Sequence, residues 1–68
     1  MSDNNFKITL KAARVNAGFK QKDAAKLLGI GNGRLVRWEQ NPEQIPGEWI
    51  AKLCDLYGVS TDRVIFLP

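Results

Sequence analysis

The sequence contains no histidine and a single cysteine, Cys54. One cysteine cannot form a disulfide within the chain, and without histidine the chain has no adequate ligand set for zinc. No histidine is present to act as a general base, and no glycine-rich phosphate loop follows a strand pattern. We therefore expect no catalytic residue, no metal and no cofactor, and we expect Cys54 to be a small buried apolar side chain.

Long apolar runs are also absent. The longest, at 49–57, is interrupted by Lys52 and Asp55, and no segment approaches the length needed to span a membrane. The polar residues 2–5 lack the charged-then-apolar pattern of a secretory signal. We expect a cytoplasmic protein in a reducing setting, with no membrane partner. In so small a core we also expect no preformed pocket for a small-molecule ligand.

The 68 residues, 44% of them hydrophobic, are enough for one domain over 1–68 with a polar N-terminal arm at 1–7. Charge is distributed unevenly along this domain. Residues 1–37 carry eight basic and two acidic side chains, a net charge of +6, whereas residues 38–68 carry two basic and five acidic ones, a net charge of −3. One side of such a domain can face a polyanion. A solvated basic surface explains the charge alone equally well.

Glycine and proline divide the chain into five short predicted helices. Thr9 is suited to cap the first helix, and Gly29 and Gly58 are suited to end the second and fourth, because glycine adopts the left-handed backbone without strain. The predicted helices cover approximately 10–17, 21–28, 32–40, 47–57 and 60–62. The alternation of a β-strand is absent throughout, so the predicted fold class is all-α.

The second and third predicted helices are joined by only three residues, 29–31. Helices connected so closely cross at a steep angle, and the crossing requires a small residue, which Ala25 supplies. Ile30 and Leu35 can fill the angle between the helices, and Trp38 can reach the core. This is the helix-turn-helix arrangement, whose second helix can enter the major groove of a duplex.

Four groups of residues, in this order and at these spacings, resemble the phage repressor and Cro family of Xre-type helix-turn-helix proteins. They are Gln21-x-x-x-Ala25-x-x-x-Gly29-Ile30, then Leu35-x-x-Trp38-Glu39, then Pro46, and then Leu53 with Tyr57-Gly58-Val59-Ser60. The resemblance covers about 10–66 and puts the motif at about 20–40. It implies a lambda-repressor-like fold of five helices. It also implies a sequence-specific DNA-binding transcriptional regulator, repressor or Cro-like, from a phage or prophage.

The resemblance also assigns residues to DNA bases. It implies that Asn32, Gly33 and Arg37 face base edges, with Arg34 alongside. Arginine can donate two parallel hydrogen bonds to guanine, and the amide of asparagine can pair with adenine. Arg37 is therefore the foremost candidate for a specificity contact. Gly33 has no side chain to read a base; it either allows close approach or simply weakens the helix, by about 1 kcal/mol.

Contacts to the DNA backbone form a second group. The resemblance implies that Gln21 touches a phosphate and buttresses a base-reading side chain. Lys20 and Lys22 flank the same end of the motif, where helix N-termini attract phosphate, and Gly31 and Asn41 are assigned to the same positioning group.

A structural pair is implied as well. In the family, an arginine of the first helix pairs with the glutamate that follows the tryptophan position, which here are Arg14 and Glu39. We therefore assign Arg14 to the fold and leave it out of the DNA contacts.

Two positions depart from the family pattern. Gly31 lacks the serine or threonine hydroxyl usual there, and the loop 42–45 has Glu43 in place of the usual cations. These changes lower the expected non-specific affinity for DNA. The first hypothesis is a regulator that binds a palindromic operator as a homodimer through its apolar C-terminal helix, in a bacterial host cell with the nucleoid. The alternative is an antirepressor of the same fold, which binds another regulatory protein and not DNA.

Overall fold

Four α-helices and two short 3₁₀-helices make up the part of the chain that the computed structural model describes, residues 7–66. The α-helices are α1 (Leu10–Asn16), α2 (Gln21–Leu28), α3 (Asn32–Gln40) and α4 (Gly47–Tyr57). The 3₁₀-helices are η2 (Pro42–Gln44) and η3 (Thr61–Arg63). No strand occurs within residues 7–66, in agreement with the all-α class.

The fifth predicted helix, at 60–62, is wrong as an α-helix. The chain forms η3 there, in which the amides of Arg63 and Val64 donate to the carbonyl oxygens of Ser60 and Thr61, at 3.0 and 3.4 Å. These are i to i+3 bonds, and the turn ends after three residues because Val64 is extended and pairs with Ile8 in an isolated parallel bridge. The helix-turn-helix fold therefore rests on four α-helices.

Local signals in the sequence determine the helix ends. The hydroxyl of Thr9 accepts a hydrogen bond from the amide of Ala12 at 3.0 Å and so caps α1. Gly29 ends α2 with φ of 75°, and the amide of Ile30 then donates to the carbonyl of Ala25 at 3.0 Å. This is the Schellman arrangement, which needs a residue that tolerates a positive φ. The turn of the motif is thus encoded by one glycine.

The core lies where the four helices meet. Three leucines from different helices are fully buried, Leu10 of α1, Leu35 of α3 and Leu53 of α4. Ala25 of α2 is 2% exposed, so its small side chain lets another element approach closely. Cys54 is buried as predicted, and desolvation, followed by the nearby charge of Asp55, raises the pKa of its thiol.

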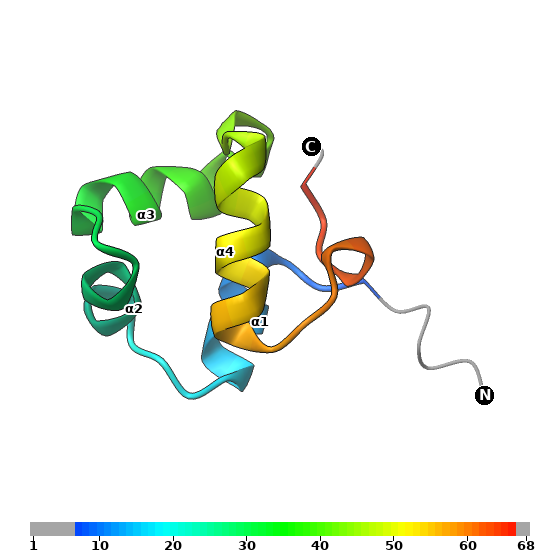
Figure 1. Ribbon diagram of the computed structural model, residues 1–68, viewed down its shortest axis with the longest axis horizontal. Coiled ribbons are helices and arrows are strands. Elements are labelled where there is room, and N and C mark those ends of the chain that lie inside the picture. Colours follow the sequence, from blue (N-terminus) through cyan, green and yellow to red (C-terminus); the bar gives the residue numbers. More distant parts are fainter. Residues whose placement is uncertain (1–6, 67–68) are drawn as a thin grey trace.

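The motif occupies one side of the molecule. In Figure 1, α2 and α3 lie on one side of α4, while η3 and the segment that enters α1 lie on the other. The bridge between Ile8 and Val64 joins these last two segments. Of the predicted arm 1–7, only Lys7 is among the described residues, and it is exposed. Within the described ranges no helix is both long and apolar enough to cross a membrane.

Candidate nucleic-acid interface

The two faces of α3 have opposite environments. Leu35 is fully buried and Trp38 is 6% exposed, so they anchor the inner face in the core. The outer face carries Asn32, Gly33 and Arg37, all of which are exposed. Within residues 7–66 the side chain of Arg37 makes no hydrogen bond or ion pair. The structure therefore brings three of the four proposed base-reading residues together on one open surface.

Arg34 lies apart from this group. Its guanidinium carbon Cζ is 5.8 Å from the centroid of the Trp38 ring. The ring of Trp38 lies in turn 5.7 Å, between centroids, from that of Trp49 in α4. Arg34 is exposed and still available to a ligand, but its position is tied to an aromatic pair that the sequence analysis did not identify.

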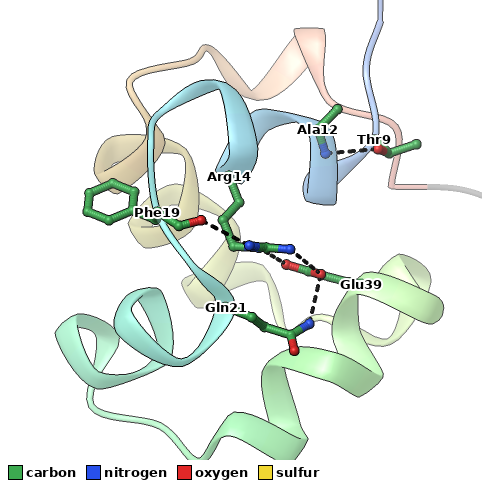
Figure 2. Close-up of polar contacts among 6 residues, drawn as sticks. All are labelled: Thr9, Ala12, Arg14, Phe19, Gln21 and Glu39. Atoms are coloured by element: carbon green, nitrogen blue, oxygen red, sulfur yellow. Dashed lines mark hydrogen bonds and ion pairs between the residues drawn. The ribbon is translucent and has the colours of Figure 1, made fainter.

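A buried ion pair holds the motif against α1. The Arg14 Nε atom lies 2.7 Å from Oε2 of Glu39, and the two side chains are only 8% and 5% exposed (Figure 2). The Arg14 Nη1 atom also donates to the carbonyl oxygen of Phe19 at 2.9 Å, and Gln21 Nε2 donates to Glu39 Oε1 at 3.0 Å. These four residues join α1, the loop before α2, the start of α2 and the end of α3. We call Arg14, Gln21 and Glu39 the polar clamp.

Gln21 has a partner that sequence reasoning missed. The resemblance assigns it to a phosphate, whereas in the structure its side-chain amide nitrogen is engaged by Glu39. The residues are 18 positions apart, and no local pattern indicates that the ends of the two motif helices face each other. The backbone amide of Gln21, as the first residue of α2, lies at the helix N-terminus.

The N-termini of α2 and α3 lack side-chain caps. Lys20 and Gly31 occupy the cap positions, and neither forms a side-chain cap hydrogen bond, in contrast to Thr9 at α1. Lys20, Gly31 and Lys22 are exposed. The first amides of both helices are therefore left without the usual acceptor, a condition that favours an anion.

Asn41 is the residue that caps the C-terminal end of α3. It is half-buried, and its side-chain amide donates to the backbone carbonyl of Arg37 at 3.4 Å. The backbone amide of Asn41 donates to the same carbonyl at 2.8 Å, so the side-chain bond is a second contact that reinforces this end of the helix. The 3₁₀-helix η2 follows at once and brings Ile45, 6% exposed, into the core.

An open hollow of about 270 Å³ lies beside the clamp, lined by Lys11, Arg14, Gln21, Val36, Glu39 and Gln40. Its volume is at the lower limit for a ligand pocket. The Arg14, Gln21 and Glu39 side chains in its lining already bond to one another. In the part of the chain that the structure describes, no three His, Cys, Asp or Glu residues gather as metal ligands would.

Tyr57 of α4 lies behind the clamp. Its hydroxyl is buried and makes no hydrogen bond within the described residues. Burial, and then the negative charge of Glu39, raise the pKa of Tyr57 to about 12, with Arg14 acting in the opposite direction. Its ring centroid is 6.1 Å from that of Phe19. The phenol is therefore a neutral packing element beside the charged pair.

Comparison with known families identifies this arrangement. A family model described as helix-turn-helix matches residues 10–64, which includes all four α-helices. The chain belongs to this helix-turn-helix family. The match confirms the resemblance to the Xre-type proteins on which the site assignments rest. Helix-turn-helix proteins are not a family of enzymes.

Two curated proteins are similar to this helix-turn-helix chain. The HTH-type transcriptional regulator ImmR of Bacillus subtilis is 43% identical over 56 residues, which cover 82% of this chain and 44% of ImmR. The isomerizing glutamine–fructose-6-phosphate aminotransferase of Methanocaldococcus jannaschii is 32% identical over 65 residues, 94% of this chain but 6% of that protein. The chain thus spans less than half of either relative, and the second likeness carries no argument about catalysis. No solved structure matches the chain.

Proposed function

We propose that this helix-turn-helix protein is a sequence-specific DNA-binding transcriptional regulator that inserts α3 into the major groove. The observation that carries the proposal is the contrast between the faces of α3, since Leu35 and Trp38 are buried while Arg37 is exposed and without a partner among residues 7–66. The similarity to a protein named as an HTH-type transcriptional regulator supports the same function.

Base reading is assigned to the outer face. Arg37 donates two hydrogen bonds to a guanine, and Asn32 pairs with an adenine through its amide. Arg34 also lies on α3 and contributes a further contact to the DNA bases. Gly33 has open space where a Cβ would lie, so it adds no obstacle to a close approach between the α3 backbone and the duplex.

Positioning is assigned to the helix ends. The uncapped amides at the N-termini of α2, which begins at Gln21, and of α3, which follows the cap residue Gly31, are directed at phosphates. Lys20 and Lys22 add positive charge at the first of these ends. Asn41 is retained as a positioning residue at the far end of α3. These contacts fix the register of the protein on DNA and carry no sequence information.

A homodimer that binds a palindromic operator gives this small domain sequence specificity, because two copies of α3 then contact two half-sites. The half-buried apolar residues of α4, Ile50 and Leu56, and the exposed Ile65 near the chain end supply apolar surface for a symmetric contact. A repressor or Cro-like protein of phage or prophage origin, acting on the DNA of a bacterial host, agrees with the family resemblance.

The second candidate is an antirepressor of the same fold. Two observations favour it: Gly33 occupies a reading position without a side chain, and Glu43 is exposed in the turn after α3, where it would repel phosphate. Such a protein would use its motif surface to bind another regulator.

A mobility-shift titration with a mixed-sequence duplex separates the two. A regulator binds at low salt and loses affinity steeply between about 50 and 200 mM salt, because phosphate contacts release counterions. Lys22→Ala should weaken every sequence about equally. Absence of binding at low salt would contradict the regulator and favour the antirepressor.

A further inference from the structure

Four side chains form a continuous series of contacts from α3 to α4. Arg34 Cζ lies 5.8 Å from the Trp38 ring centroid, and the Trp38 and Trp49 rings are 5.7 Å apart at an angle of 51°. On the Trp49 ring, Lys52 Nζ lies 4.4 Å from the centroid. Arg34 and Lys52, the cations at the two ends of this series, are both exposed. The distance between their charged groups cannot exceed the sum of the three distances given above.

Lys52 holds a special position in the charge distribution. It is the only lysine or arginine between Arg37 and Arg63. Glu48 precedes it by one helical turn, yet Lys52 makes no ion pair among the described residues. Its ammonium group is thus free to accept a further anionic partner while the aromatic ring holds it in place.

The turn between α3 and α4 cannot supply such a cation. Its residues are Pro42, Glu43, Gln44 and Ile45. Ile45 is committed to the core, and Glu43 is negative and exposed. Any positive charge that follows α3 on the way to the flanking DNA backbone must therefore come from the next element, α4.

We propose that Lys52 is a DNA-phosphate contact and that Trp49 is its positioning residue. This inference rests on the proposed function, since it takes α3 to be in the major groove. With Arg34 at the groove edge, the contacts through the tilted rings of Trp38 and Trp49 set the spacing to Lys52, which we place against the backbone of the same duplex. The negative face of the indole holds the ammonium group and leaves its N–H donors for phosphate.

The test is the salt dependence of binding to a mixed-sequence duplex. Loss of one phosphate contact lowers the slope of log K against log salt by about 0.9. We expect this change in Lys52→Gln. The matched control is Lys7→Gln, which removes the same charge next to the Ile8–Val64 bridge and should keep the wild-type slope. The segment that enters α1 lies across α4 from the motif (Figure 1). Equal slopes for the two variants would overturn the inference while leaving the proposed function intact. No binding by the wild type would overturn both.

Trp49 variants test the positioning. Trp49→Phe keeps an aromatic face and should retain a slope close to that of the wild type, whereas Trp49→Leu should lower it as much as Lys52→Gln does. In a Lys52→Gln background, Trp49→Leu should lower the slope no further. A wild-type slope in folded Trp49→Leu, or a full further decrease in the double variant, would overturn the role of Trp49. Because Trp49→Phe is the milder change, a lowered slope in that variant would count against it as well.

Discussion

The inner and outer faces of α3 differ in whether their side chains have partners. On the inner face Leu35 is fully buried and Glu39 is held by two other residues of the polar clamp. On the outer face Asn32 and Arg37 are exposed, and Arg37 is unpaired within the described ranges. One helix thus carries the stability of the motif on one side and its proposed reading surface on the other.

The difference has a physical cause. A charge on the inner face loses its hydration and must be fully compensated, which the clamp does with an ion pair and two further hydrogen bonds. A charge on the outer face keeps its water until a ligand displaces it. Substitutions should therefore separate the two properties, with large effects on folding from one face and effects on DNA affinity from the other.

The largest effect is expected from the inner face. Glu39→Ala leaves the Arg14 guanidinium buried without its counter-charge and should lower the free energy of unfolding by about 3–5 kcal/mol. Urea denaturation followed by circular dichroism measures this change. Gln40→Ala, at the exposed neighbouring position, should stay within about 0.5 kcal/mol of the wild type. A loss as small as that of the control would mean that the clamp does not stabilise the motif.

The outer face should show the reverse behaviour. Arg37→Ala should cost about 1–3 kcal/mol of operator affinity, because a bidentate contact to one base is lost. Its free energy of unfolding should change by no more than about 0.5 kcal/mol. Titration of a selected operator and a denaturation curve on the same sample give both values. Reduced stability with unchanged affinity would reverse the assignment of the two faces.

Gly33→Ala should give a smaller, opposite effect on folding. Nothing lies within 4 Å of the place where a Cβ would be, so alanine fits and should stabilise the protein by up to about 1 kcal/mol through its helix propensity. Thermal unfolding measures the gain, and a decrease would mean that the site is constrained. Operator affinity then discriminates between two roles, since it falls only if the backbone approaches the DNA closely at this position.

Tyr57→Phe should have the smallest effect at neutral pH. The hydroxyl lacks a hydrogen bond among residues 7–66, so its removal should change the free energy of unfolding by no more than about 1 kcal/mol. Because the pKa of Tyr57 is raised from 10.0 to about 12 in the folded chain, the contribution of the neutral phenol is present below pH 10 and is lost as the pH rises toward 12. The variant should lose less stability than the wild type between pH 9 and pH 11. Parallel losses would contradict the raised pKa.

Features encoded by neighbouring residues could be predicted from the sequence. Thr9 and Gly29 act on the backbone within a few positions, so the start of α1 and the turn of the motif follow from local chemistry. Contacts between distant positions could not be derived in this way. The bond from Gln21 to Glu39 and the tilted contact between the Trp38 and Trp49 rings depend on how helices pack, and the ion pair of the clamp was expected only from the family resemblance.

The short last element shows the same limit. Ser60 and an acidic residue after it are typical of a helix start, but the chain there has only three residues before Val64 joins the bridge to Ile8. That bridge pairs residues from opposite ends of the sequence. A tertiary contact therefore replaced the α-helix that the local pattern favoured.

Selection of preferred sites from a random duplex pool, with the wild type and Arg37→Ala in parallel, decides whether the outer face of α3 reads DNA. We expect the wild type to select a palindrome, and we expect the variant to lose its preference at one base pair of each half-site while the other positions are kept. A wild-type pool without any preferred sequence, or the same preference in both proteins, would contradict base reading by this face.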